Sequence, residues 1–100
     1  MGNHKTAWLY CHADKWEGKD EIYRQVLILC DFCKSRGLYI HGVSKRIGER
    51  KPPESFSGSD YLLVTDFNRI SIDSAKLAEY IKYAENLGTK VVEVNATVEV

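Results

Sequence analysis

The chain has 100 residues, which suits one domain and is too short for two. Apolar residues make up 44% and charged residues 28%, as in an ordinary soluble globular protein. The formal net charge of zero argues against tight autonomous DNA binding, and no apolar run approaches the ~20 residues of a membrane span.

The first half of the chain predicts a strand, a helix and a second strand. Residues 7–13 are short, apolar and aromatic, which indicates a buried strand. Residues 20–36 predict an amphipathic helix that ends at Gly37. Residues 38–43 predict the second strand, and residues 44–59 contain glycines and prolines that predict a loop. Residues 1–6 are expected to form a disordered tail.

The second half repeats this alternation. Residues 61–65 predict a third strand, residues 74–87 a helix that ends at Gly88, and residues 90–94 a fourth strand. Residues 97–100 are compatible with a short fifth strand. The alternation predicts an α/β fold in three layers, with helices on both faces of a mostly parallel central sheet of about four strands and residues 7–13 in its interior. The expected topology is flavodoxin-like.

Polar residues follow three of the predicted strands. Functional crevices of such sheets lie at the carboxyl ends of the strands, which here are residues 12–14, 44–50 and 66–69. The first strand ends in the sequence Tyr-Cys-His-Ala-Asp at residues 10–14. After the second strand Ser44 leads to Arg50, and after the third comes Asp-Phe-Asn-Arg-Ile-Ser-Ile-Asp at residues 66–73.

These stretches resemble the N-terminal catalytic domain of the serine recombinases, the resolvase and invertase family. The family's first strand typically ends in Tyr-Ala-Arg-Val-Ser, and its third is followed by Lys-Leu-Asp-Arg-Leu-(Ser/Gly)-Arg-Asp. Gln25 matches a glutamine near the start of the family's first helix. The resemblance covers residues 7 to about 94 and implies a single resolvase-like domain over residues 1–100, related to site-specific DNA recombination.

The resemblance implies a set of catalytic positions and a set of phosphate contacts. In the family a serine hydroxyl attacks a DNA phosphodiester, and arginines stabilise the phosphate charge. The catalytic positions are Asp14, which replaces the serine nucleophile, and His12, Gln25, Ser44, Arg50 and Arg69. The phosphate or DNA contacts are Lys45, Arg46, Arg50 and Arg69. No metal and no cofactor are implied.

Departures from the family pattern predict that the domain does not cleave DNA. A carboxylate at Asp14 is a poor nucleophile toward a phosphodiester and repels it. His12, Asn68 and Ile72 replace an arginine, an aspartate and a second arginine of the family, and residues 52–59 look too short for the helix placed there. We expect a degenerate domain from mobile DNA or phage, with weak DNA binding or with a second copy or another recombinase-like protein as its partner. Any anion should lie between residues 44–50 and Arg69.

Other interpretations of the same residues stay open. Asp14 is also explained as a polar cap, Arg50 and Lys51 as solvated loop residues, and Arg69 as an ion-pair partner of Asp66 or Asp73. A second hypothesis is a metal-dependent phosphoryl-transfer domain, loosely Toprim-like, in which Asp14, Asp66 and also His12 supply ligands. A metal site formed by His12, His41, Asp14 and Asp66 is a related interpretation of the strand ends. A third is a non-catalytic protein-interaction module. Convergence of Arg50 and Arg69 on Asp14 favours the first hypothesis, and convergence of Asp14 and Asp66 favours the second.

The three cysteines predict free thiols. An odd number, without a signal peptide, is typical of the reducing cytoplasm. Cys30 and Cys33 form one C-x-x-C near the end of the predicted helix, whereas redox motifs of this kind open a helix. A zinc site needs two further ligands at suitable spacing, so we expect buried thiols on the helix face.

Overall fold

The computed structural model describes residues 4–56 and 58–96. Within these ranges four strands form one sheet in the order β2-β1-β3-β4, and every neighbouring pair is parallel. The strands are β1 (Thr6–Ala13), β2 (Tyr39–Ile47), β3 (Tyr61–Val64) and β4 (Lys90–Glu93). The predicted parallel sheet is therefore confirmed, and β1 lies in its interior as expected.

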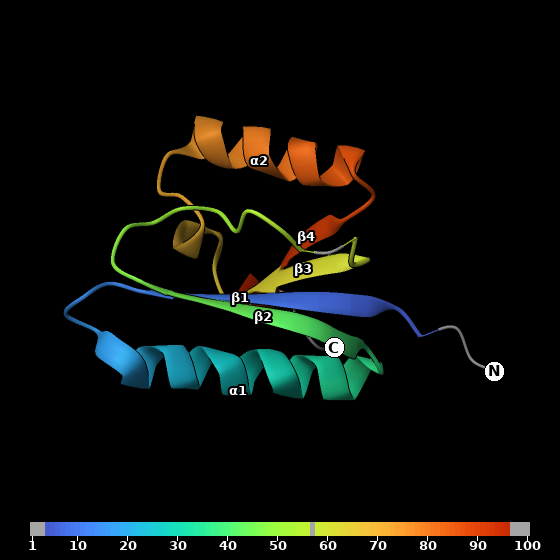
Figure 1. Cartoon of the computed structure of the whole chain (residues 1–100), viewed down its shortest axis with the longest axis horizontal. Helices are drawn as coiled ribbons and strands as arrows, with labels where there is room; N and C mark the ends of the chain where they lie inside the picture. Colours follow the sequence, from blue (N-terminus) through green and yellow to red (C-terminus); the bar gives the residue numbers. More distant parts are fainter. Residues whose placement is uncertain (1–3, 57, 97–100) are drawn as a thin grey trace.

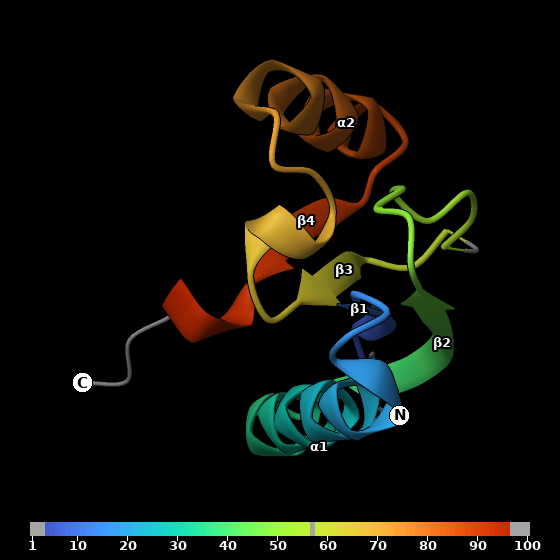
Figure 2. The ribbon, with the colours of Figure 1, turned by 90° about the vertical axis from the view of Figure 1, so that its left-hand side faces the viewer.

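Two helices cover opposite faces of the sheet. Figures 1 and 2 show α1 (Gly18–Arg36) on one face and α2 (Ser74–Asn86) on the other. Right-handed crossovers between parallel strands bring each helix back over the sheet. The three-layer α/β architecture is thus the predicted one, and neither helix has the length and apolarity that a membrane crossing requires.

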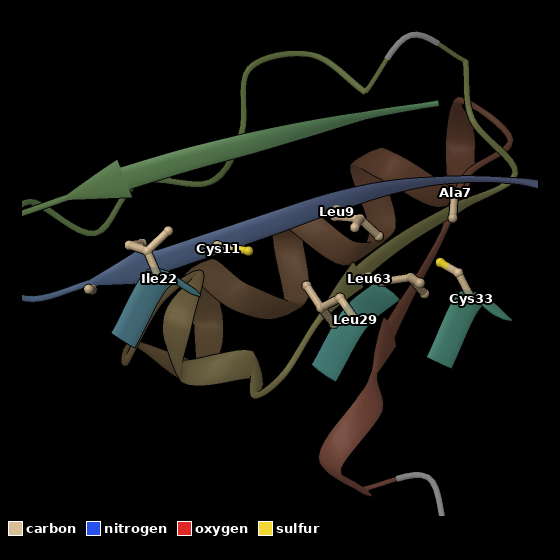
Figure 3. Close-up of a cluster of buried hydrophobic side chains, with 8 residues drawn as sticks. Ala7, Leu9, Cys11, Ile22, Leu29, Cys33 and Leu63 are labelled. Carbon is tan, nitrogen blue, oxygen red and sulfur yellow. The ribbon is translucent and has the colours of Figure 1, made fainter. Parts of the chain in front are cut away.

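The core on the α1 side joins one face of β1 to the buried face of the helix. Figure 3 shows Leu9 and Cys11 of β1 with Leu29 and Cys33 of α1 and Leu63 of β3. All five are almost completely inaccessible to solvent. The seven- and four-residue spacings of Ile22, Leu29 and Cys33 place them on the same face of the helix, which explains why this helix could be predicted from sequence.

A second core lies under α2 and the connection from β2 to β3. Buried members are Tyr10, Phe56, Leu62, Val64, Ile70, Ala84 and Val91. The connection is held in place by two tyrosines: the Tyr10 hydroxyl donates to the Lys51 carbonyl, and the Tyr80 hydroxyl to the Pro53 carbonyl at 2.9 Å. In Figure 1 residues 48–56 run on the α2 side of the sheet.

Several element boundaries differ from the sequence predictions. β2 continues to Ile47 instead of ending at residue 43, because its main chain pairs with β1 along the whole of that strand. Thr6 opens β1 and is not part of a disordered tail. Val94 begins a short 3₁₀ turn, Val94–Ala96, after β4 has ended. The predicted fifth strand, residues 97–100, lies outside the described residues, as do residues 1–3 and 57.

Local sequence signals account for the helix ends. Gly37 has φ 68°, a left-handed conformation that favours glycine, and it ends α1 as predicted. The Asp73 carboxylate accepts hydrogen bonds from the main-chain N–H groups of Ala75 and Lys76, which caps α2. The described residues within 52–59 form no helix, in line with the shortness of this segment.

Candidate functional site

An ion pair joins the ends of β1 and β2 at the carboxyl edge of the sheet. Arg50 lies 2.9 Å from a carboxylate oxygen of Asp14, measured from Nη2 to Oδ2. Its other terminal nitrogen donates to the carbonyl of Asn68, just after β3. Arg50 therefore bridges three chain segments, and its side chain is only 25% exposed. It is not the solvated loop residue of the alternative interpretation.

A second ion-pair cluster holds Arg69 against the start of α1. Its guanidinium contacts both carboxylate oxygens of Glu17, at 2.7 and 3.0 Å, and one oxygen of Glu21 at 3.1 Å. All three side chains are at most 15% exposed. The hydrogen bond from Arg69 lowers the pKa of Glu17 to about 2, and the bond to Glu17 in turn raises the pKa of Arg69.

Arg69 does form ion pairs, as one interpretation of the sequence held, but not with Asp66 or Asp73. Asp66 accepts from the Asn95 side-chain amide, and Asp73 caps α2. The actual partners, Glu17 and Glu21, lie about 50 positions earlier in the chain and were not predicted from the sequence. The available signal was their spacing with Gln25: positions 17, 21 and 25 recur at four residues, which places them on one face of a helix.

Gln25 ties α1 to the end of β1. Its side chain accepts from the His12 N–H at 3.0 Å and donates to the His12 carbonyl at 2.7 Å. The amide nitrogen also lies 2.7 Å from Glu21, whose pKa is lowered by hydrogen bonds from Arg24 first and then from Gln25. Gln25 is fully buried, so in this structure it positions the β1 end and the Arg69 cluster.

His12 is fully buried and lies next to Asp14 of the Asp14–Arg50 pair. Its Nε2 lies 2.8 Å from the Gly48 carbonyl oxygen and 3.9 Å from a carboxylate oxygen of Asp14. A carbonyl only accepts hydrogen bonds, so the proton belongs on Nε2. The other ring nitrogen, Nδ1, has no hydrogen-bond partner among the described residues. His12 thus holds Gly48, the first residue after β2, by a side-chain hydrogen bond.

Ser44, Lys45 and Arg46 lie within β2 and not in the predicted loop. Ser44 accepts a hydrogen bond from the Trp8 indole at 2.8 Å. Arg46 donates to the Glu49 carbonyl at 2.8 Å and lies 3.7 Å from the Glu49 carboxylate. Lys45 contributes to a groove on the α1 side of the sheet. Among the described residues, Ser44 and Arg46 bond to Trp8 and Glu49 and not to Arg69, and the predicted contact of Lys45 and Arg46 with phosphate or DNA stays a prediction.

The four residues proposed as metal ligands do not converge on one site, although His12 and Asp14 lie close together. Asp14 is paired with Arg50, and Asp66 is bonded to Asn95. β2 continues to Ile47, so His41 lies near the start of this strand and far from its carboxyl end. Its Nδ1 is 3.0 Å from the Ser59 hydroxyl. Within the described ranges no group of three or more His, Cys, Asp or Glu residues could hold a metal ion.

The three cysteines are free thiols, as expected. Cys11 and Cys33 are buried in the α1-side core, and Cys30 is half-buried beside them. Burial raises the pKa of Cys11 to about 12 and that of Cys33 to about 11. Protonated, inaccessible thiols are poor nucleophiles, so Cys11 and Cys33 serve as small core residues.

No protein-family model and no curated protein match the sequence. Solved structures do match the fold. A resolvase-family site-specific recombinase from Streptococcus pneumoniae has a TM-score of 0.78 at 14% identity, over 94% of this chain and 74% of that one. The fold is that of a serine recombinase catalytic domain.

Two further structures carry the same fold. The N-terminal catalytic domain of TP901-1 integrase has a TM-score of 0.75 at 14% identity, over 94% of this chain and 80% of that one. The C-terminal catalytic domain of ISC1926 TnpA, an IS607-like serine recombinase, has a TM-score of 0.76 at 17% identity, over 89% of this chain and 70% of that one. The serine recombinase fold predicted from the strand-end motifs is therefore confirmed.

Proposed function

We propose that this chain is a serine-recombinase-fold domain that does not cleave DNA and acts by binding. The observation that carries the proposal is the Asp14–Arg50 ion pair. The resemblance places the nucleophilic serine at Asp14 and a phosphate-binding arginine at Arg50. A carboxylate at that position is a poor nucleophile for a phosphodiester, repels the phosphate, and neutralises the arginine that would hold it.

The second phosphate-binding position supports the same proposal. Arg69 already has two carboxylate partners, Glu17 and Glu21, at hydrogen-bond distance. A phosphate could bind Arg69 only by displacing them. The family's next arginine is Ile72 in this chain, and its side chain is 80% exposed. Since removal of one transition-state contact commonly costs about 10²–10³ in rate, the combined changes leave no basis for strand cleavage.

Binding of DNA or of a recombinase-like partner remains the role that this fold supports. The second half of β2 carries Lys45 and Arg46, and the segment that follows it carries Lys51. The Asp14–Arg50 pair lies at the carboxyl end of the sheet. Zero net charge and the nearby carboxylates imply that DNA binding is weak and sensitive to salt. We infer that any such role belongs to recombination-related DNA transactions.

A plasmid-nicking assay tests the absence of cleavage. Supercoiled plasmid is incubated with the protein in a buffer containing a metal chelator, and the products are separated with and without protease digestion. We expect neither nicked plasmid nor a protein–DNA adduct. We expect the same for Asp14→Ser, because His12, Asn68 and Ile72 remain. A protease-sensitive adduct formed by the unaltered chain would overturn the proposal.

A further inference from the structure

Large apolar side chains are exposed along β2 and along the neighbouring surface of α1. On α1 these are Tyr23, which is 69% exposed, and Leu27. On β2 they are Tyr39, Ile40, Val43 and Ile47. Single exposed apolar residues are common on proteins, but exposed apolar side chains on two packed elements mark an interaction surface.

A groove runs between these two elements on the α1 side of the sheet. Its volume is about 390 Å³. The residues that line it are Lys19, Ile22, Tyr23 and Val26 of α1, with Lys45 and Ile47 of β2. We call it the α1–β2 groove. It combines an apolar floor with two lysines and has no carboxylate in its lining, so it favours an occupant with apolar and acidic side chains.

The strand that borders this groove has a free edge. β2 is the first strand in the sheet order, and among the described residues its main chain forms strand pairs with β1 alone. Residues 48–56 leave β2 toward the α2 side (Figures 1 and 2), so they do not cover the groove. A nine-residue edge strand presents a row of N–H and C=O groups that can pair with another strand.

We propose that the α1–β2 groove binds an extended acidic segment of a partner protein, which adds to β2 as a new edge strand. Main-chain hydrogen bonds to β2 supply much of the affinity, and alternate side chains enter the groove. Apolar side chains contact Val43, Ile47 and Tyr23. Acidic side chains contact Lys45 and Lys19, on the two walls.

Charge selects this occupant over a second copy of the chain. Residues 39–47 include Lys45 and Arg46 and no aspartate or glutamate. Pairing two β2 edges would therefore place cations in the interface with no carboxylate on either strand to balance them, which disfavours the contact. A partner strand of opposite charge removes this repulsion. The inference goes beyond the proposed function and is independent of whether the domain cleaves DNA.

A peptide titration tests the proposal. The probe is a blocked heptapeptide of sequence Val-Thr-Glu-Thr-Val-Thr-Glu, which places valine and glutamate on the same face of an extended strand. It is added to ¹⁵N-labelled protein and followed by NMR, and the control peptide has lysine in place of each glutamate. We expect the acidic peptide to shift the amide signals of residues 43–47 and 19–27, while the basic peptide leaves them unchanged. Lys45→Glu and Lys19→Glu should each weaken binding about tenfold, whereas Lys82→Glu on α2 should not.

Each other result counts against the proposal. Unshifted amides in both segments at millimolar acidic peptide would overturn it, as would equal affinities of Lys45→Glu and Lys82→Glu. Shifts in the same segments that grow with protein concentration alone would assign the surface to a second copy instead. Lys19→Glu keeps the test valid if Lys45→Glu fails to fold, because Lys19 lies on the helix wall and takes no part in the sheet. The plasmid assay is unaffected by any of these outcomes.

Discussion

The cluster around Arg69 joins three charged side chains that are largely shielded from water. Two carboxylates from the start of α1, Glu17 and Glu21, meet one guanidinium that follows β3, and Gln25 links Glu21 to the end of β1. An ion pair this shielded from water is costly to break on one side only, because the remaining charge loses a partner that water does not fully replace. Glu17 and Arg69 therefore hold α1 to the carboxyl edge of the sheet.

This cluster makes the stability of the domain depend on pH. The pKa of Glu17 is about 2 in the folded protein against its usual 4.5, so the folded state favours the carboxylate. Its stabilisation is fully present above pH 4.5 and is lost as the pH falls toward 2. Glu17→Gln should lower the free energy of unfolding by about 1–3 kcal/mol at pH 7.

Urea unfolding followed by circular dichroism at pH 7, 4.5, 3 and 2 measures this difference. The gap between Glu17→Gln and the unaltered chain should shrink as the pH falls and be nearly absent at pH 2. Glu79→Gln, an exposed glutamate of α2, is the matched control and should show no gap at any pH. A constant gap across the whole range would show that the glutamine disturbs packing and not charge.

At this scale the sequence allowed part of the site to be predicted. Asp14, Arg50 and Arg69 were placed at the carboxyl ends of strands by local pattern alone, and they lie there. Their partners were not predictable in the same way, because an ion pair depends on which distant segments the fold brings together. Glu17 carried only the helical spacing with Glu21 and Gln25 as a signal. Asp66 and Asp73 were suggested as partners because they are near Arg69 in sequence, but the fold brings Glu17 and Glu21 to Arg69 instead.

Among the elements, β2 departs furthest from its predicted length. Its apolar run ends at Val43, but β1 offers main-chain partners as far as Ala13, which pairs with Ile47. Lys45 and Arg46 are compatible with an edge strand, where charged side chains reach solvent. A prediction from sequence pattern ends a strand at its last apolar residue. In the folded sheet β2 continues for as long as β1 offers main-chain hydrogen-bond partners.

Gly42 shows how closely β2 packs on its neighbour. The Trp8 ring lies over the glycine, and an added Cβ would come within 2.2 Å of the ring atom Cζ3. Three ring atoms lie closer than 3 Å to that position, so the indole would have to move and would lose its bond to Ser44. The absence of a side chain at residue 42 is thus required by packing.

Gly42→Ala should therefore destabilise the domain by about 1–3 kcal/mol, although alanine usually suits a strand better than glycine does. Thermal and urea unfolding would measure the loss. The control is the same change in a Trp8→Leu background, where the smaller side chain leaves room for the methyl group and the cost should largely vanish. An equal cost in both backgrounds would place its origin in the backbone and not in the Trp8 contact.

For the whole molecule, the alternation of strands and helices was enough to predict the architecture. Parallel strands with right-handed crossovers leave few arrangements, and β1 was expected in the interior because residues 7–13 are apolar on both faces. The sequence does not specify which side chains from the two helices meet across the sheet. The structure shows two cores, one under each helix, which are separated only by β1 and β3.

Since both cores rest on the same two strands, the domain should unfold as one cooperative unit. Leu29 belongs to the core under α1 and Ile70 to the core under α2, and neither is exposed. Leu29→Ala and Ile70→Ala should each lower the free energy of unfolding by about 2–5 kcal/mol.

Far-ultraviolet circular dichroism reports both helices, and Trp8 fluorescence in a Trp16→Phe background reports the α2 side of the sheet. We expect the two signals to change together in both variants. If Ile70→Ala shifted the fluorescence transition ahead of the loss of helix signal, the two layers would be folding as separate units despite their shared strands.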